Sequence, residues 1–170
     1  MADYLDLDDR RLLAECDVHA YRASGPGGQK RNKTSSAVRL RHRPTGLTVV
    51  GTESRSQHEN RARALRRLRQ AIALEVRRPV DLTDFTVPEP VQVCLGRDGR
   101  FCVSVRNERY WPCVQAVLDL LDAVDAQVGE AARRLGVSTA ALSALLTRDG
   151  KVLAAANRIR QDHGCRPLRG

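Results

Sequence analysis

The clearest pattern in the first third of the chain is a strict alternation of apolar and charged residues. Within residues 34–43, Val38 and Leu40 alternate with Arg39 and Arg41. Successive side chains of a strand point to opposite faces of a sheet, so this segment predicts a strand with one buried face and one basic face.

Two further strands are predicted beside it. Residues 17–22 form a short strand, and residues 47–52 form a return strand after the turn Pro44-Thr-Gly46. Between the first two strands, residues 23–29 read Ala-Ser-Gly-Pro-Gly-Gly-Gln. This density of glycine and proline excludes regular structure and predicts an exposed loop.

Helical periodicity follows over residues 56–77. Apolar residues recur there at helical spacing, namely Leu65, Leu68, Ile72 and Val76. Their spacing predicts an amphipathic helix with basic residues on another face. Pro79 and the segment Thr86-Val-Pro-Glu-Pro90 end this helix and provide the best linker.

The second half of the chain predicts a separate unit. Alternation over residues 91–95 and 101–105, around Asp98-Gly99, is typical of a β-hairpin. A helix with one apolar stripe begins at Tyr110-Trp-Pro112, and a last amphipathic helix contains Val152 to Ile159. Between them, residues 127–146 resemble a helix-turn-helix, with Gly136 as the stop and Ser138 as the next N-cap.

These elements predict an α+β fold: a small β-sheet with a packed helix, and a mainly helical C-terminal unit with a β-hairpin and a helix-turn-helix-like segment. We expect two domains, residues 1–87 and 88–170. At 170 residues, the chain is long enough for a real core without disulfide or metal staples.

Charge changes this picture from a plain globular fold to one with a polyanionic partner. The net charge is +9, and residues 22–78 contain 15 Lys and Arg against three Glu. Nucleic acid is the commonest partner for such an excess. The usual alternative is a merely solvated basic face.

Other classes of protein and site are disfavoured. No apolar run is long enough to span a membrane, and the acidic start is not a signal peptide, so we expect a cytoplasmic protein without a membrane partner. The five cysteines are scattered without a C-x-x-C pair, which favours buried thiols over disulfides or zinc. We therefore expect no metal and no cofactor.

One motif carries candidate chemistry. A Gly-Gly-Gln tripeptide is weak evidence alone, but here Arg22 to Leu40 are followed by Pro44-Thr-Gly46, Glu53-Ser-Arg-Ser-Gln57 and Asn60-Arg61. In this order, over residues 15–78, the chain resembles the peptidyl-tRNA hydrolase (GGQ) domain of bacterial peptide chain release factors and of codon-independent ribosome-rescue hydrolases.

The resemblance implies the catalytic residues Gly27, Gly28 and Gln29. Glycine allows a close backbone approach, and a main-chain N–H can stabilise an oxyanion or a departing ribose oxygen. The Gln29 side chain can orient a water but has no pKa suited to a general base. Because the family's glutamine is often methylated on its amide nitrogen, a glutamine methyltransferase acting on Gln29 is an implied partner.

The flanks of the motif and the basic strand and helix are expected to contact ribosomal RNA. Asn32, Lys33 and Thr34 match the family's flank, whereas Lys30 and Arg31 depart from it. The full RNA-binding set predicted is Arg22, Lys30, Arg31, Asn32, Lys33, Thr34, Arg39, Arg41, Arg63, Arg66 and Arg67.

The resulting function hypothesis is a ribosome-dependent peptidyl-tRNA hydrolase that frees nascent chains from stalled ribosomes. The sequence leaves no room for a codon-reading domain, so we expect codon-independent release, although residues 148–170 are a poor match to the basic tail of rescue hydrolases. The alternatives are a non-catalytic ribosomal or RNA-binding module and a DNA regulator. The last is disfavoured because Thr139 to Leu146 contain no Arg, Lys, Asn or Gln to read bases.

Overall fold

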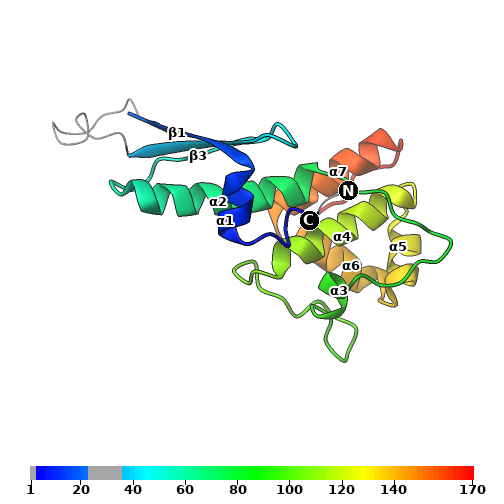
Figure 1. Ribbon diagram of the computed structural model, residues 1–170. Coiled ribbons are helices and arrows are strands. Elements are labelled where there is room, and N and C mark those ends of the chain that lie inside the picture. Colours follow the sequence, from blue (N-terminus) through cyan, green and yellow to red (C-terminus); the bar gives the residue numbers. More distant parts are fainter. Residues whose placement is uncertain (1–2, 23–35) are drawn as a thin grey trace. The chain divides into compact units, whose positions relative to one another are not determined.

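The computed structural model describes residues 3–22 and 36–170. The chain divides into two compact units, residues 2–72 and residues 73–170. The first unit contains a three-stranded antiparallel sheet and the second is helical, which confirms the predicted α+β class (Figure 1). No helix in the described part of the chain is long and apolar enough to cross a membrane.

The sheet of the first unit has the strand order β1-β2-β3, with β1 at Cys16–Tyr21, β2 at Ala37–His42 and β3 at Thr48–Gly51. Tyr21 pairs with Ala37 at one end of the ladder between β1 and β2. Every second residue of β2 is buried after Ala37, and Arg39 and Arg41 are exposed. The alternation in the sequence therefore predicted both faces of this strand correctly.

Helix α2, Gln57–Glu75, runs along the sheet in Figure 1. The predicted residues Leu65, Leu68 and Ile72 are buried, and they form the core of the unit with Val38 and Leu40 of β2. The two strand residues face this helix because the pleat of β2 turns its apolar side inward.

A short helix precedes the sheet and was not predicted. Helix α1, Asp9–Ala14, begins where the Asp8 side chain accepts a hydrogen bond from the Arg11 N–H at 2.8 Å. Its single fully buried residue is Leu12. A six-residue helix with adjacent Leu12 and Leu13 is too short to show helical periodicity, so only the cap could have indicated this element.

In the second unit α4, Tyr110–Ala123, is the central helix. It contacts α3 (Glu89–Gln92), α5 (Val128–Leu135) and α7 (Gly150–Asp162), and ten of its 14 residues are buried. A helix that is apolar almost all round belongs in the middle of a bundle.

The helix-turn-helix-like pair is confirmed as two helices. Helix α5 ends at Gly136, which has a left-handed φ of 69°, and α6 occupies Thr139–Thr147. The Ser138 side chain caps α6 by accepting a hydrogen bond from the Ala141 N–H at 3.1 Å. Both signals were readable because glycine at a helix end and serine at a helix start satisfy orphan backbone groups.

The predicted hairpin over residues 91–105 is wrong in most of its length. Its first predicted strand overlaps α3, which follows Pro88 and has Pro90 in its first turn, and only Leu95 and Phe101 form a bridge. The second predicted strand, residues 101–105, is not formed because Arg148 takes its carbonyl groups. The Arg148 guanidinium donates to the carbonyls of Phe101 and Val103 at 3.2 and 2.9 Å. These carbonyls bond a side chain instead of a partner strand.

Candidate functional site

The candidate catalytic residues belong to the segment that joins β1 to β2. Gly27, Gly28 and Gln29, and the predicted RNA contacts Lys30, Arg31, Asn32, Lys33 and Thr34, lie outside the described residues. The two ends of this segment are described. Tyr21 and Ala37 are paired in the ladder, so the candidate segment begins and ends at neighbouring positions of one sheet.

A buried asparagine holds the second of these ends. Asn60, in the first turn of α2, is fully buried, and its Nδ2 donates to the carbonyl oxygens of Ser36 and Ser54, each at 2.7 Å. Its Oδ1 accepts from the Ser54 N–H at 2.9 Å. Three hydrogen bonds to backbone therefore tie the start of β2 and the approach to α2 to one side chain.

Close backbone packing between Gly51 of β3 and Asn60 of α2 also holds the start of α2. A Cβ added at Gly51 would lie 2.9 Å from the carbonyl carbon of Asn60 and closer still to its carbonyl oxygen. Real Cβ atoms keep a greater distance from backbone, so only glycine allows β3 and α2 to approach this closely here.

The exposed face of the sheet is basic. Arg39 and Arg41 lie on this face of the central strand, opposite His19 and Asp17 of β1. Among residues 3–22 and 36–170, neither arginine has an ion pair or a side-chain hydrogen bond. Free guanidinium groups can form bidentate contacts with phosphate, which is the kind of contact predicted for these two residues.

The predicted arginines of α2 divide into two kinds. Arg66 is exposed, as is Arg22 at the end of β1. Arg67 instead bonds the Val50 carbonyl and the Glu53 carboxylate, and Arg63 lies 3.9 Å from that carboxylate.

The hydrogen bond from Arg67 lowers the pKa of Glu53 to about 2, with a smaller contribution from the Thr52 N–H. Arg67 therefore joins β3 to α2, and its charge is offset within the fold. Sequence spacing placed Arg63 and Arg67 on the basic face but could not show that Glu53 reaches them.

One histidine is part of a buried polar cluster in the first unit. His42 is fully buried, with Nε2 3.0 Å from Glu15 Oε2 and Nδ1 2.8 Å from Thr45 Oγ1. The Tyr4 ring meets the imidazole edge-on at 4.8 Å. The cluster links α1 to the turn between β2 and β3, which is a structural role.

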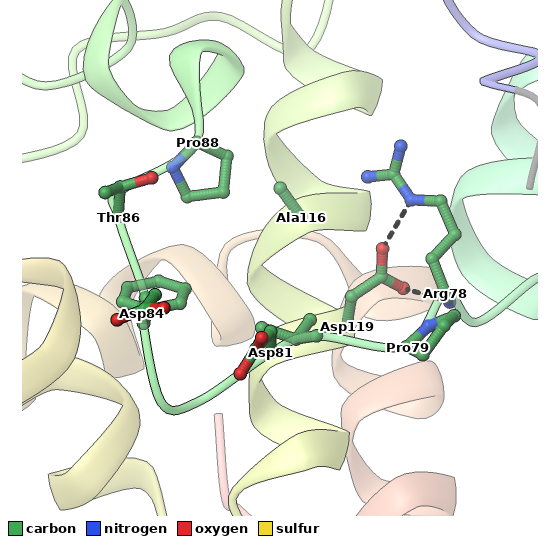
Figure 2. A pocket seen from close by; sticks show the side chains of 10 residues that line it. Arg78, Pro79, Asp81, Asp84, Thr86, Pro88, Ala116 and Asp119 are labelled. Carbon is green, nitrogen blue, oxygen red and sulfur yellow. Dashed lines mark hydrogen bonds and ion pairs between the residues drawn. The ribbon is translucent and has the colours of Figure 1, made fainter.

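The second unit has a pocket of about 400 Å³ beside α4 (Figure 2). Its buried acidic group, Asp119, accepts from Arg78 Nε at 2.7 Å and lies 3.2 Å from Arg77 Nη1. Burial raises the pKa of Asp119, while the facing guanidinium groups act in the opposite direction. The carboxylate is already satisfied by these partners, and none of the predicted site residues lines the pocket.

The comparisons with known proteins agree with the geometry of the first unit. Residues 12–81 match the family model of the RF-1 domain. Peptide chain release factor 1 of Rickettsia bellii is 47% identical over 76 residues, which are 45% of this chain and 21% of that protein. Peptide chain release factor 2 of Paramagnetospirillum magneticum is 59% identical over 56 residues, 33% of this chain and 15% of the relative. The chain thus spans about a fifth or less of the length of these curated relatives.

The first unit is a small α+β domain in which a Gly-Gly-Gln segment joins two neighbouring strands. The matched residues begin in α1, contain the whole sheet and end beyond α2. Residues 12–81 are thus similar to the RF-1 domain family, and the resemblance to the release factor GGQ domain is confirmed.

Proposed function

We propose that this protein hydrolyses the ester bond of peptidyl-tRNA on the ribosome and so releases the nascent chain. The observation that carries the proposal is the position of Gly27-Gly28-Gln29 within the residues that match the RF-1 domain. Two similar proteins are named as peptide chain release factors.

In the proposed reaction, water attacks the carbonyl carbon of the ester, and the bond to the terminal ribose oxygen breaks. The peptide leaves with a new carboxyl group, and the ribose oxygen takes a proton. The Gln29 main-chain N–H donates a hydrogen bond where negative charge develops, which is the usual role of an oxyanion-hole donor. The Gln29 side chain orients the water but does not remove its proton, because an amide does not titrate near neutral pH.

The proposed contacts with ribosomal RNA involve the exposed arginines of the predicted set that do not pair with Glu53. These four arginines are Arg22, Arg39, Arg41 and Arg66. Arg39 and Arg41 lie on the same face of β2. Arg63 and Arg67 serve mainly the fold, because Glu53 pairs with both.

We also propose the predicted boundary near residue 87 as the limit of the hydrolase domain, and cytoplasmic ribosomes as its place of action.

The finer part of the proposal is that release does not require a stop codon. The test is release of labelled peptide from ribosome complexes with a vacant decoding site, compared with complexes that present a stop codon. We expect similar rates from the two complexes. Strong stimulation by the stop codon would contradict codon-independent release while leaving hydrolysis itself intact.

The residue-level test uses Gln29→Ala and Gly28→Ala. Both variants should bind ribosomes like the wild type and lose most of the release, because Gln29→Ala removes the side chain that orients the water and Gly28→Ala restricts the backbone that places the Gln29 N–H. If the wild-type protein binds ribosomes but releases nothing, the second candidate function holds. That candidate is a non-catalytic RNA-binding module, which the exposed Arg39 and Arg41 on β2 favour.

We propose Gln29 as a substrate of a glutamine methyltransferase as well. Trypsin cleaves after Arg22 and Lys30, so the modified residue would lie in the peptide 23–30. Mass spectrometry of this peptide from the native organism should show one added methyl group, and a peptide without it would contradict the proposal.

A further inference from the structure

We propose that Asn60 is a positioning residue for peptide release, because it fixes the point from which the Gly-Gly-Gln segment leaves the sheet. The inference rests on the proposed function. It is carried by the juxtaposition of Asn60, on α2, with the carbonyl of Ser36, the last residue before β2.

The buried Asn60 side chain is costly unless it is fully hydrogen-bonded. Asn60 has no exposed surface, and burying an amide is unfavourable unless its polar atoms find partners. Here Nδ2 donates both of its hydrogens and Oδ1 accepts one, all with backbone groups. Two segments separated in sequence, at Ser36 and Ser54, are thereby held at fixed distances from α2.

The pinned residue, Ser36, is close along the chain to the candidate donor. Gln29 and Ser36 are seven residues apart, and Ser36 adjoins the ladder pair Tyr21–Ala37. Hydrogen bonds have narrow ranges of length and angle, whereas apolar contacts allow sliding. A polar pin next to the ladder therefore restricts where the segment returns to the sheet more tightly than apolar packing could.

Catalysis is sensitive to the placement of the reacting groups. A displacement of about 1 Å in a catalytic group can reduce the rate by about a hundredfold. Loss of the pin should therefore reduce kcat for release while leaving the RNA-contacting arginines, and hence ribosome affinity, in place. A residue that only stabilises the fold should change neither parameter in the fraction of molecules that stays folded.

The experiment compares Asn60→Asp with the matched control Leu68→Ala. The aspartate variant keeps the size of the side chain and the bond from the Ser54 N–H, but it cannot donate to either carbonyl when ionised. Leu68 is on the same helix and is fully buried without polar contacts, so its loss destabilises the same unit. Both proteins are assayed at a temperature where circular dichroism shows them folded, and Asn60→Ser replaces Asn60→Asp if the latter does not fold.

We expect Asn60→Asp to reduce kcat for release by about tenfold or more, with the half-saturating ribosome concentration within about twofold of wild type. Leu68→Ala should keep both values. In a Gln29→Ala background the Asn60 substitution should cause a smaller loss than in wild type, because the pin acts through the placement of residue 29 and the water-orienting side chain is already gone. An unchanged kcat, an equal loss in Leu68→Ala, or an additive loss in the double variant would overturn the proposal.

A second readout does not depend on release. Amide hydrogen exchange in the ends of β1 and β2, residues 19–22 and 36–38, should accelerate in Asn60→Asp more than in Leu68→Ala. If wild type releases no peptide but this local acceleration is seen, the proposed function fails while the structural role of the pin stands. If exchange at these ends does not change, the pin itself is refuted.

Discussion

Gly51→Ala tests the closest backbone contact of the site. The added methyl group would meet the main chain of Asn60, with 2.9 Å to its carbonyl carbon and 3.2 Å to its Cα. These atoms are backbone, so no rotamer change relieves the crowding. The start of α2 or the end of β3 has to move by an amount on the order of 1 Å in a close-packed interior.

The magnitude follows from two opposing effects. Overpacking of this kind costs about 1–3 kcal/mol. Alanine also restricts the unfolded chain, and that effect stabilises by about 0.4–1 kcal/mol. We therefore expect a net loss of about 1–2 kcal/mol in the free energy of unfolding, and a urea midpoint lower by up to about 1 M for a typical m-value.

The assay is urea unfolding followed by far-ultraviolet circular dichroism, with Gly129→Ala as the matched control. A Cβ at Gly129, in the first turn of α5, would meet nothing within 4 Å, and alanine is the better helix former. The control should leave the midpoint unchanged or raise it. If Gly51→Ala also raises the midpoint, the close approach of β3 to α2 is not the reason for the glycine.

Three further perturbations separate structural from RNA-contacting charges. Asp119→Ala should lower the free energy of unfolding by about 3–5 kcal/mol, because it leaves the partly buried guanidinium groups of Arg77 and Arg78 without their carboxylate. The measurement is thermal or urea unfolding, and a loss below about 1 kcal/mol would be inconsistent with the ion pairs. Glu53 has a pKa lowered to about 2, so its contribution is complete above its ordinary pKa and is lost as pH falls through 2. Acid titration of Glu53→Gln should therefore lack this loss, and parallel acid curves would count against the Arg67 bond. Replacing Arg39 and Arg41 by alanine should weaken ribosome binding and reduce the slope of log K against log salt by about one per contact; an unchanged slope would remove both from the interface.

Elements set by local pattern could be predicted from the sequence, and those set by distant partners could not. The alternation around Arg39 predicted β2 and its faces, and Gly136 with Ser138 predicted the break between α5 and α6, because each signal acts within a few residues. The hairpin over residues 91–105 had an equally good local pattern. It failed because Arg148, more than forty positions away, takes the carbonyls that a second strand would need.

The candidate site shows the same division. The Gly-Gly-Gln segment and its resemblance were readable because they are contiguous in sequence. The pairing of Glu53 with Arg67 and the three bonds of Asn60 depend on the approach of α2 to β3, which no spacing within either element encodes. Asn60 appeared only as one residue of the resemblance, and a polar residue early in a helix is usually exposed or a cap.

The asparagine at position 60 is best explained by its directional hydrogen bonds rather than by a gain in stability. An apolar residue of similar size could fill the space at the start of α2 without the cost of burying an amide, but it could not select one position for the Ser36 carbonyl. Gly51 brings β3 close enough for the first turn of α2 to lie beside the root of the candidate segment, and Asn60 then bonds that root directly. The two residues act together: Gly51 allows the close approach of β3 to α2, and Asn60 then holds the Ser36 carbonyl at a fixed distance from α2. Under the proposed function, in which the catalytic group lies on a connection between strands, a rigid base is needed because an error at the base is carried along the connection to the reacting atoms.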